Sequence, residues 1–484
     1  MPQMDLFSLQ ERREVTKRAG PPNRMNDLTY RDWMKFQKSF FRFTSQEALI
    51  AENIHFFTKA LWDDQTPSRS LLLTNATVDV AAFEPRQVSV VPVASPIKAI
   101  VDQMAVAATS NLEYDFALVD LRQALLSMND MEDFIHFHEL FFTHLRRLLV
   151  TDRYCCLLAP TISVKSCEFP ASWLVASLGR TSLRLRDEKI AIEDSDRLFY
   201  CLYFQANDDG RTTPLELVNM VDVSTPQPVH YPGWIIPKPP PRTKTEVLHP
   251  AKFPETLVEQ FIDIFTDEGD KILDPMVGTG SAVVAAVRRG RHGYGIELSP
   301  EFATIAQSRV VNETTLWTLD RVPGHIFQGD ACRIGEIPHL ANVTFDYMIT
   351  SPPYWNMLKN PGSENQRKRR QKNLVLAYSD NESDLGNVDD YDEFLDALTR
   401  VYTSIGPRIK RKGYATIIVK NIKRNHTVFP LAWDLTERLT KTGMFRYLGT
   451  TFWCQDDIAL KPFAVGIYWV SNIFHHYCLH FERV

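Results

Sequence analysis

The 484-residue sequence has no uninterrupted apolar run long enough to cross a lipid bilayer, and its N-terminal stretch MPQMDLFSLQERREVTKR is too charged for a secretory signal. It also lacks a CxxC pair, the spacing that is typical of zinc and redox sites, and its 7 cysteines are scattered. We therefore expect a cytoplasmic protein without a metal site, in which most cysteines are buried apolar thiols.

Glycine is missing between Gly20 and Gly179, so we expect no nucleotide-binding glycine turn in this part of the chain. Positive charge is not in excess either: the formal net charge is −5, and a nucleic-acid partner would need a local basic surface. One run of basic residues could form such a surface: Arg367, Lys368, Arg369, Arg370 and Lys372. A solvated loop is the usual structure of a charge run, and nucleic-acid contact is the more specific interpretation.

A strand, a glycine turn and a helix are predicted in succession from residue 271. Residues 271–277 have the pattern of a short buried strand, Gly278-Thr279-Gly280 follows, and SAVVAAVRRG has helical periodicity. Glycines let the backbone approach a ligand, and the amides of a helix N-terminus face it. An ordinary tight turn is the alternative for this motif taken alone.

Three further strands end in polar residues. The strand predicted at 292–298 contains Glu297, about 20 residues after the glycine turn, where a carboxylate can bind two ribose hydroxyls. The strand at 325–330 ends at Asp330, and the strand at 345–349 runs into TSPPYW (350–355). Because ligands bind beyond the carboxyl ends of parallel strands, we expect these residues to meet at one site.

The remaining pattern completes an α/β sheet. A helix is predicted at 391–409, and strands at 414–419, 446–453 and 464–470. Alternating strands and helices indicate a mostly parallel sheet, and the missing helix between the last two strands indicates an antiparallel last strand.

Five motifs together resemble the ordered motif set of S-adenosylmethionine-dependent DNA methyltransferases that modify exocyclic amino groups, at cytosine N4 or adenine N6. They are HPAKFPE (249–255), DPMVGTGS (274–281), GIELS (295–299), GDA (329–331) and TSPPYW. The resemblance covers residues 248–484 and implies a Rossmann-like class I methyltransferase sheet. It implies cofactor contacts from Lys252, Phe253, Pro254, Asp274, Pro275, Gly278, Thr279, Gly280, Glu297, Leu298, Asp330 and Ala331.

The same resemblance makes TSPPYW the catalytic corner, formed by Ser351, Pro352, Pro353 and Tyr354. The prolines fix the backbone, so that the serine hydroxyl and the Pro352 carbonyl can accept hydrogen bonds from the target amine. Tyr354, helped by Trp355, would stack on a base flipped out of double-stranded DNA. Methyltransferases that act on cytosine carbon use a cysteine after proline, and this sequence has no Pro-Cys dipeptide.

Serine preceded by threonine in this motif favours cytosine N4 over adenine N6 among similar enzymes. An RNA methyltransferase and a non-catalytic DNA-binding or assembly subunit are the other two interpretations. The resemblance also implies a restriction-modification or phage-defence setting, in which a restriction nuclease or other defence proteins are partners. A monomer and a homodimer are both compatible with the sequence.

An internal repeat links the two halves at a constant offset of 260 residues. MEDF at 131 and YDEF at 391 begin similar helical patterns, Tyr154 corresponds to Tyr414, and Trp173 corresponds to Trp433. At either side, residues 114–116 match 345–347 and residues 202–204 match 467–469. Under this alignment Asp120, Leu121 and Arg122 replace the residues of the catalytic corner that begin at Ser351.

These observations predict a domain plan in which the first half contains a decayed, non-catalytic α/β half-copy. The plan has a mobile N-terminus (1–26), a helical or mixed segment (27–112), the degenerate half (113–230), a proline-rich linker (231–247) and a catalytic domain (248–484) with a basic loop (359–388). The predicted order is therefore decayed second half, cofactor half and catalytic half, as after duplication and rearrangement. The aromatic-rich stretch 27–57 is assigned to core packing, with DNA contact as the alternative.

Overall fold

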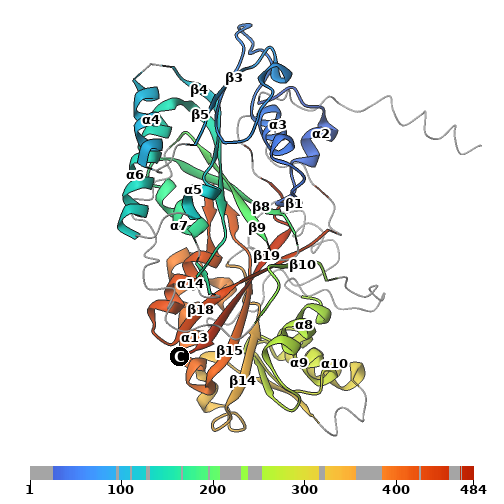
Figure 1. Ribbon diagram of the computed structural model, residues 1–484. Coiled ribbons are helices and arrows are strands. Elements are labelled where there is room, and N and C mark those ends of the chain that lie inside the picture. The colour runs from blue at the N-terminus through green and yellow to red at the C-terminus, as the bar shows by residue number, and fades with distance from the viewer. Residues whose placement is uncertain are drawn as a thin grey trace, which may run out of the picture.

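Two α/β sheets lie end to end in the computed structural model, one from each half of the chain (Figure 1). The structure describes residues 25–93, 98–109, 112–126, 131–164, 167–169, 171–194, 197–207, 230–237, 253–314, 322–355, 384–424, 427–456, 460, 469 and 471–484. Within these ranges no helix is long and apolar enough to cross a membrane. Five of the six cysteines described are buried, and only Cys332 is exposed.

The C-terminal sheet has eight strands in the order β10-β18-β19-β15-β14-β11-β12-β13. Their bounds are β10 (Trp234–Ile235), β11 (Lys271–Asp274), β12 (His292–Glu297), β13 (Gly324–Gln328), β14 (Phe345–Thr350), β15 (Ile409–Val419), β18 (Phe445–Cys454) and β19 (His475–Arg483). Only β19 is antiparallel to its neighbours, so the predicted mostly parallel sheet with an antiparallel last strand is confirmed.

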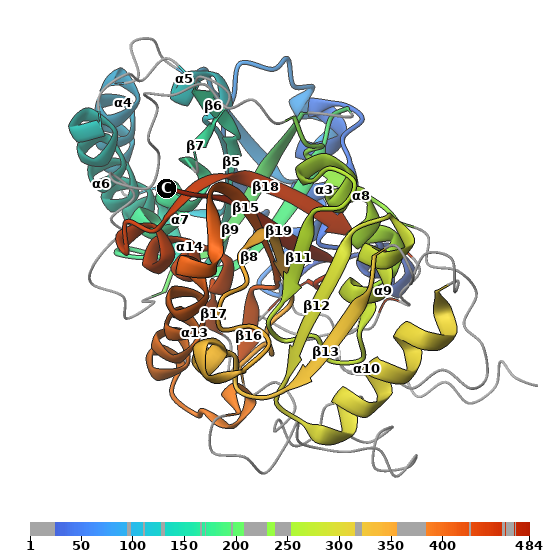
Figure 2. The ribbon, with the colours of Figure 1, turned by 90° about the horizontal axis from the view of Figure 1, so that it is seen from below.

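Helices cover both faces of this sheet (Figure 2). One face packs against α8 (Glu255–Phe265), α9 (Ser281–Arg288) and α10 (Pro300–Glu313), and the other against α13 (Tyr391–Ile405) and α14 (Leu431–Lys441). The first apolar residues of β11 and β14 are fully buried, as is usual for central parallel strands. A small hairpin, β16 (Ile422–Arg424) and β17 (Thr427–Phe429), follows β15.

The N-terminal sheet has seven strands in the order β1-β8-β9-β5-β4-β2-β3. Their bounds are β1 (Phe40–Arg42), β2 (Arg69–Leu73), β3 (Gln87–Val91), β4 (Tyr114–Asp120), β5 (Leu149–Pro160), β8 (Arg184–Ile192) and β9 (Leu198–Gln205). Its helices are α2 (Tyr30–Lys35), α3 (Gln46–Phe57), α4 (Lys98–Ala108), α5 (Arg122–Leu126), α6 (Met131–Leu148) and α7 (Ala171–Gly179), and β6 (Ile162–Val164) pairs with β7 (Cys167–Phe169).

The two sheets share one strand order and one register. Tyr154 of β5 lies opposite Phe116, as Tyr414 of β15 lies opposite Tyr347. The antiparallel strand is β9 in the first sheet and β19 in the second. At the edge of the first sheet β1 pairs in parallel with β8, and at the edge of the second sheet β10 pairs in parallel with β18. The fold class predicted from the sequence, an α/β methyltransferase-type sheet preceded by a degenerate α/β copy, is confirmed.

The degenerate copy is more complete than predicted, and three boundaries change. Strands β2 and β3 lie within residues 27–112 and pair with β4, so the division at 113 falls inside one hydrogen-bonded sheet. Their places correspond to β11 and β12, so the first copy has its own version of the cofactor half. Part of the predicted linker forms β10, and Met25 and Asn26, placed in the mobile N-terminus, are buried.

The last strand was also matched to the wrong segment. Leu202 of β9 lies opposite Leu157, and the residue in this position of the second sheet is Leu479 of β19, opposite Ile417. Residues 202–204 therefore correspond to 479–481. The strand predicted at 464–470 lies outside the described residues except for Trp469, which is in no strand.

The interface between the sheets has approximate two-fold character. Hairpin β6–β7 contacts β18, and its counterpart β16–β17 contacts β8. Trp173 and Trp433, which correspond at an offset of 260, stack on each other with ring centroids 6.0 Å apart. In an isologous dimer, two copies contact each other through the same surface, so that every contact occurs twice. The two sheets of this single chain contact each other in the same way. The stretch 27–57 packs on the first sheet instead, where Phe56 and Phe57 are buried in a cluster with Phe116 and Tyr154, so core packing is the correct interpretation.

Candidate active site

A cavity of about 320 Å³ opens at the carboxyl ends of β11, β12, β13 and β14. The sequence placed eight of its lining residues at a site: Pro275, Gly278, Glu297, Leu298, Asp330, Ala331, Ser351 and Pro353. Three more lining residues, Met276, Ser299 and Gly329, lie inside the motifs but were not named individually as contacts. The sequence missed those that follow the motifs or come from α13 and the turn before it, which are Phe302, Cys332, Asp384, Leu385, Val388, Ala397, Arg400 and Val401. The strand ends that we expected to meet at one site do line one cavity. The opposite wall of this cavity comes from α13 and the turn before it, which carry no motif.

The glycine turn is held in a conformation that requires glycine. Gly278 and Gly280 have φ of 53° and 90°, in the left-handed region that favours glycine. A Cβ on Gly280 would lie 3.1 Å from the Cα of Ala306 in α10, so the turn also needs a residue without a side chain. The Gly278 amide donates a hydrogen bond of 2.8 Å to Glu297 Oε2, which ties the turn to the end of β12.

Two buried carboxyl groups lie beneath and beside this turn. Glu297 Oε1 also accepts a bond from the Ser299 amide (2.9 Å), and burial raises the pKa of Glu297 to about 7. Asp274 Oδ1 accepts from the Met276 amide (3.1 Å), whereas Oδ2 is buried without a hydrogen-bond partner among the described residues. Burial raises the pKa of Asp274 to about 7 as well, with a smaller contribution from nearby Glu297.

The catalytic corner predicted from the sequence begins where β14 ends. Ser351 Oγ lies 3.1 Å from the hydroxyl of Tyr354, and Ser351 and Pro353 line the cavity. Burial raises the pKa of Tyr354 far above its usual range, so this hydroxyl is neutral. The Tyr354 ring, which we expected to stack on a base, is only 8% exposed.

Trp355 does not have the position that the sequence suggested. We expected it to contact DNA, but its side chain is 4% exposed and packs against Phe429 (centroids 4.9 Å apart) and Tyr391 (5.3 Å). The Arg424 guanidinium lies 4.9 Å from its ring centroid. In this structure the side chain anchors the corner in an aromatic cluster, with φ of 44° at Trp355, and its contact with DNA stays a prediction.

The other predicted contacts divide into three groups. Phe253 is buried in the core formed with α8, Pro254 caps that helix, and Pro352 and Thr279 lie beside the cavity without lining it. Lys252 lies outside the described residues, as does the whole basic cluster 367–372. The described residues contain no cluster of histidine, cysteine and acidic side chains placed to hold a metal ion.

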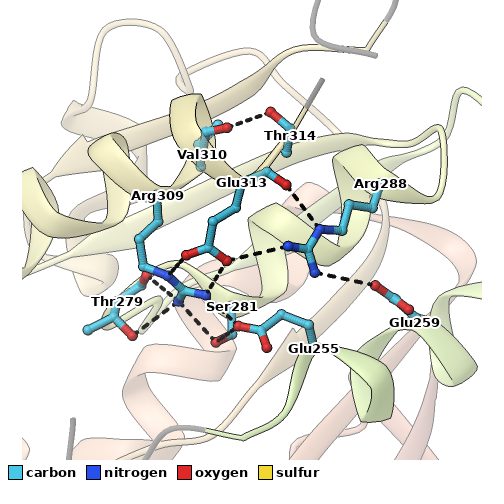
Figure 3. A network of polar contacts seen from close by, with 9 residues as sticks. All are labelled: Glu255, Glu259, Thr279, Ser281, Arg288, Arg309, Val310, Glu313 and Thr314. Atoms are coloured by element: carbon cyan, nitrogen blue, oxygen red, sulfur yellow. Dashed lines mark hydrogen bonds and ion pairs between the residues drawn. The ribbon is translucent and has the colours of Figure 1, made fainter. Parts of the chain in front are cut away.

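A half-buried arginine that no motif signalled supports the glycine turn (Figure 3). Arg309 of α10 donates a bond of 2.8 Å to the Thr279 carbonyl and forms ion pairs with Glu255 and Glu313. Glu255, the last residue of HPAKFPE, accepts in turn from the Ser281 hydroxyl at 2.8 Å. An isolated arginine in a polar helix carries no sequence signal, so this network could not have been predicted.

The corresponding corner of the first sheet is occupied by its own side chains. Asp120 has the place of Ser351 and is paired with Arg122 at 2.9 Å, and Gln46 donates to Asp120 at 3.1 Å. The Arg122 guanidinium also lies 4.3 Å from the Phe199 ring centroid. Both Asp120 carboxylate oxygens therefore accept hydrogen bonds from residues of the first half itself.

The residues around the cavity at the strand ends fit S-adenosylmethionine. A volume of about 320 Å³ is within the range of small-molecule sites, and the carboxyl groups of Glu297, Asp330 and Asp384 line it. The ligand is a cation at sulfur and carries amino and hydroxyl donors, which carboxylates accept.

Residues 125–308 match the model of a DNA methylase family whose members modify N6 and N4 amino groups. Among curated proteins, a type II methyltransferase of Streptococcus pneumoniae, M2.DpnII, is 46% identical over 65 residues, 13% of this chain and 24% of that protein. The orphan methyltransferase M.BamHII of Bacillus amyloliquefaciens is 41% identical over 64 residues, with 13% and 24% covered. The matched segment thus spans about a quarter of these relatives' length.

Among solved structures, TrmN from Thermus thermophilus is 10% identical and covers 79% of this chain and 78% of that one, with a TM-score of 0.31. The fold assignment given above therefore depends on the strand order. The segment matched by the family model crosses both sheets: its first part includes α6, β5 and β9, and its second part includes α8, β11 and β12.

Proposed function

Because the chain carries a domain of the N6- and N4-type DNA methylases, we propose that it transfers a methyl group from S-adenosylmethionine to an exocyclic amino group of a base in DNA, cytosine N4 in particular. The observation that carries this proposal is the position of Ser351: its hydroxyl lies in the wall of the same cavity as Glu297 and Asp330.

The bound cofactor would supply an electrophilic methyl group on a sulfonium. The target amine would take this methyl group, the electron pair of the sulfur–carbon bond would stay on sulfur, and the proton lost by the amine would pass to solvent. Glu297 would accept the ribose hydroxyls, since its oxygens are held in place by the Gly278 and Ser299 amides. Asp330, whose Oδ1 is fixed by the Cys332 amide at 2.9 Å, is placed for the adenine amino group.

The corner acts on the target amine through geometry. The lone pair of an aromatic amine is delocalised into the ring, and acceptors on its two N–H bonds favour a pyramidal nitrogen that can attack. Ser351 Oγ and the Pro352 carbonyl are those acceptors. The Tyr354 hydroxyl fixes the orientation of the serine, because the two oxygens are 3.1 Å apart and both side chains are buried.

Serine at the first position of the corner supports cytosine N4, and adenine N6 is the alternative. Labelled S-adenosylmethionine, incubated with protein and duplex DNA and followed by nucleoside mass spectrometry, separates the two. We expect N4-methylcytosine. Label found only in N6-methyladenine would overturn the choice of base, and label found only in RNA would overturn the choice of nucleic acid.

Affinity for duplex DNA comes, in this proposal, from the basic cluster after the corner. Arginine contacts with phosphate release counterions, so binding should weaken steeply with salt. Changing Arg367, Arg369 and Arg370 to glutamine should lower affinity and flatten the slope of binding against salt. An unchanged slope would leave the cluster as a solvated loop. A restriction setting, with a nuclease partner, is supported by the type II enzymes among the relatives.

A further inference from the structure

The first sheet presents two buried carboxyl groups to the sheet that carries the catalytic corner. They are Asp187 and Glu188, next to a bulge in β8, and their side chains are 0% and 5% exposed. The second sheet has a bulge at the same place in β18, where Gly449 and Thr450 follow. The acidic pair is therefore a property of the first sheet alone, and the repeat does not explain it.

Asp187 binds the hairpin that follows β15. It forms an ion pair with Lys423 of β16 and accepts a hydrogen bond from the Ser471 amide. Lys423 also donates to the Ser471 carbonyl at 3.2 Å, so the carboxylate, the lysine and this turn form one closed set of bonds. Removing the half-buried lysine would leave the fully buried Asp187 carboxylate without its ion pair, which is costly.

Glu188 binds the residue that connects β15 to the same hairpin. Its Oε1 accepts from Asn421 Nδ2 at 2.6 Å and from the Tyr477 hydroxyl. Asn421 Oδ1 accepts in turn from the Ala432 amide at the start of α14 (3.0 Å). The end of β15 is therefore fixed from the first sheet, directly beside the end of β14 and the corner.

The opposite side of the hairpin touches the corner itself. Arg424, the neighbour of Lys423, lies over the Trp355 ring, and Phe429 of β17 packs against it. Trp355 directly follows Tyr354, whose hydroxyl meets Ser351. A two-stranded hairpin is marginally stable in water, so its position is set by the surfaces on which it docks.

We propose that the seven-stranded sheet positions the catalytic corner, with Asp187 and Glu188 as the positioning residues. They act through the β16–β17 hairpin and Asn421, and touch neither cofactor nor base. This inference deepens the proposed function and rests on it as far as the rate of methyl transfer is concerned. It gives the degenerate copy a role that does not require chemistry of its own.

The variant Glu188→Ala tests the proposal in the full-length protein. We expect single-turnover methyl transfer to DNA to slow by about tenfold to a hundredfold, the scale for small misplacement of reacting groups, while cofactor affinity stays within about twofold. Glu188→Gln, which keeps an acceptor for Asn421, should restore the rate to within about threefold of wild type. Lys423→Met breaks the Asp187 ion pair from the other side and should also slow transfer.

The matched control is Asp115→Ala, which removes a carboxylate of the same sheet that pairs with Arg153 at 3.5 Å, within that sheet. It should lower the melting temperature without a change in rate. Hydrogen exchange of peptides covering 345–355 and 420–424 adds a readout that needs no substrate: Glu188→Ala should speed exchange there by about tenfold or more, and Asp115→Ala should not.

Unchanged exchange in both peptides, or a lower melting temperature with an unchanged rate, would overturn the positioning role. If the wild-type protein methylates no DNA, the proposed function fails, whereas the exchange experiment still decides whether the first sheet holds the corner in place.

Discussion

Replacing Ser351 by alanine separates the chemistry of the corner from its structure. The hydroxyl is within 3.1 Å of the Tyr354 hydroxyl and lies in the cavity wall, whereas the Gly278 and Ser299 amides fix Glu297 without it. Loss of one positioned polar group costs about 2.7–4 kcal/mol in the transition state, or about 10²–10³ in rate. We expect Ser351→Ala to slow methyl transfer by that factor and to leave cofactor affinity nearly unchanged.

The assay is single-turnover transfer of labelled methyl groups to duplex DNA, with calorimetric titration of the cofactor beside it. The change also leaves the buried Tyr354 hydroxyl without its partner, which should destabilise the fold by about 1–3 kcal/mol. Tyr354→Phe is the control, because it breaks the same hydrogen bond and keeps the serine. It should have the smaller effect on rate. Parallel losses of cofactor affinity and rate in Ser351→Ala would refute the reasoning and make the corner a structural turn.

Three further changes test the site around the cofactor. Burial raises the pKa of both Asp274 and Glu297 to about 7, above their unfolded values, so the native state holds these protons more tightly and the stability of the ligand-free protein should fall as pH rises from about 4 to 7. Asp274→Asn should reduce that slope by the share of one group in denaturant titrations and should weaken cofactor binding at pH 8. Arg309→Met leaves Glu255 buried without its ion pair and should cost about 3–5 kcal/mol of unfolding free energy. The same change at the more exposed Arg288 should cost less than about 1 kcal/mol. Equal costs would contradict the role of Arg309 in supporting the glycine turn. Gly280→Ala would add a contact at 3.1 Å to an unfavourable φ, whereas Gly269 has a φ of 86° and open space around it. The melting temperature should therefore fall further for Gly280→Ala than for Gly269→Ala. Equal shifts would mean that backbone strain alone determines the loss of stability.

The motif-bearing parts of this fold could be predicted from the sequence because each motif combines a strand end with a residue type that the site requires. The strands ending near Asp274, Glu297 and Ser351 were placed correctly to within a few residues. The wall formed by Leu385, Val388 and Val401 could not be placed. Val401 belongs to the amphipathic helix α13, whose apolar residues look the same whether they line a cavity or a core, and Leu385 and Val388 belong to a short turn before it that has no motif.

The first half shows a second limit. Strands β2 and β3 have no glycine turn between them, so nothing in residues 27–112 indicated a cofactor-type half-sheet. Their assignment depends on hydrogen bonds to β4, which are non-local. Trp355 illustrates the same point at one residue: an aromatic side chain after a proline corner is compatible with stacking on a base or with anchoring the corner, and only the position of Phe429 decides between them.

The segment matched by the family model and the two sheets of the fold have different boundaries. This difference determines which parts of the chain the proposed active site needs. The matched segment, 125–308, joins strands β5 and β9 of the first sheet to β11 and β12 of the second, yet no hydrogen-bonded sheet contains both groups. The corner of the first sheet, where Asp120 pairs with Arg122, lies just before the matched segment. Within the segment, β11 leads into the cofactor turn and pairs with β14, whose corner at Ser351 lies beyond the match. A working site therefore requires the turn from within the matched segment and the corner from beyond it. Separating the chain at residue 308 should abolish methyl transfer by either piece, whereas Arg122→Ala in the whole chain should leave the transfer rate unchanged. Methyl transfer by the piece that ends at residue 308 would contradict this reasoning, because that piece lacks the corner at Ser351. It would mean that the segment matched by the family model forms a site without the second corner.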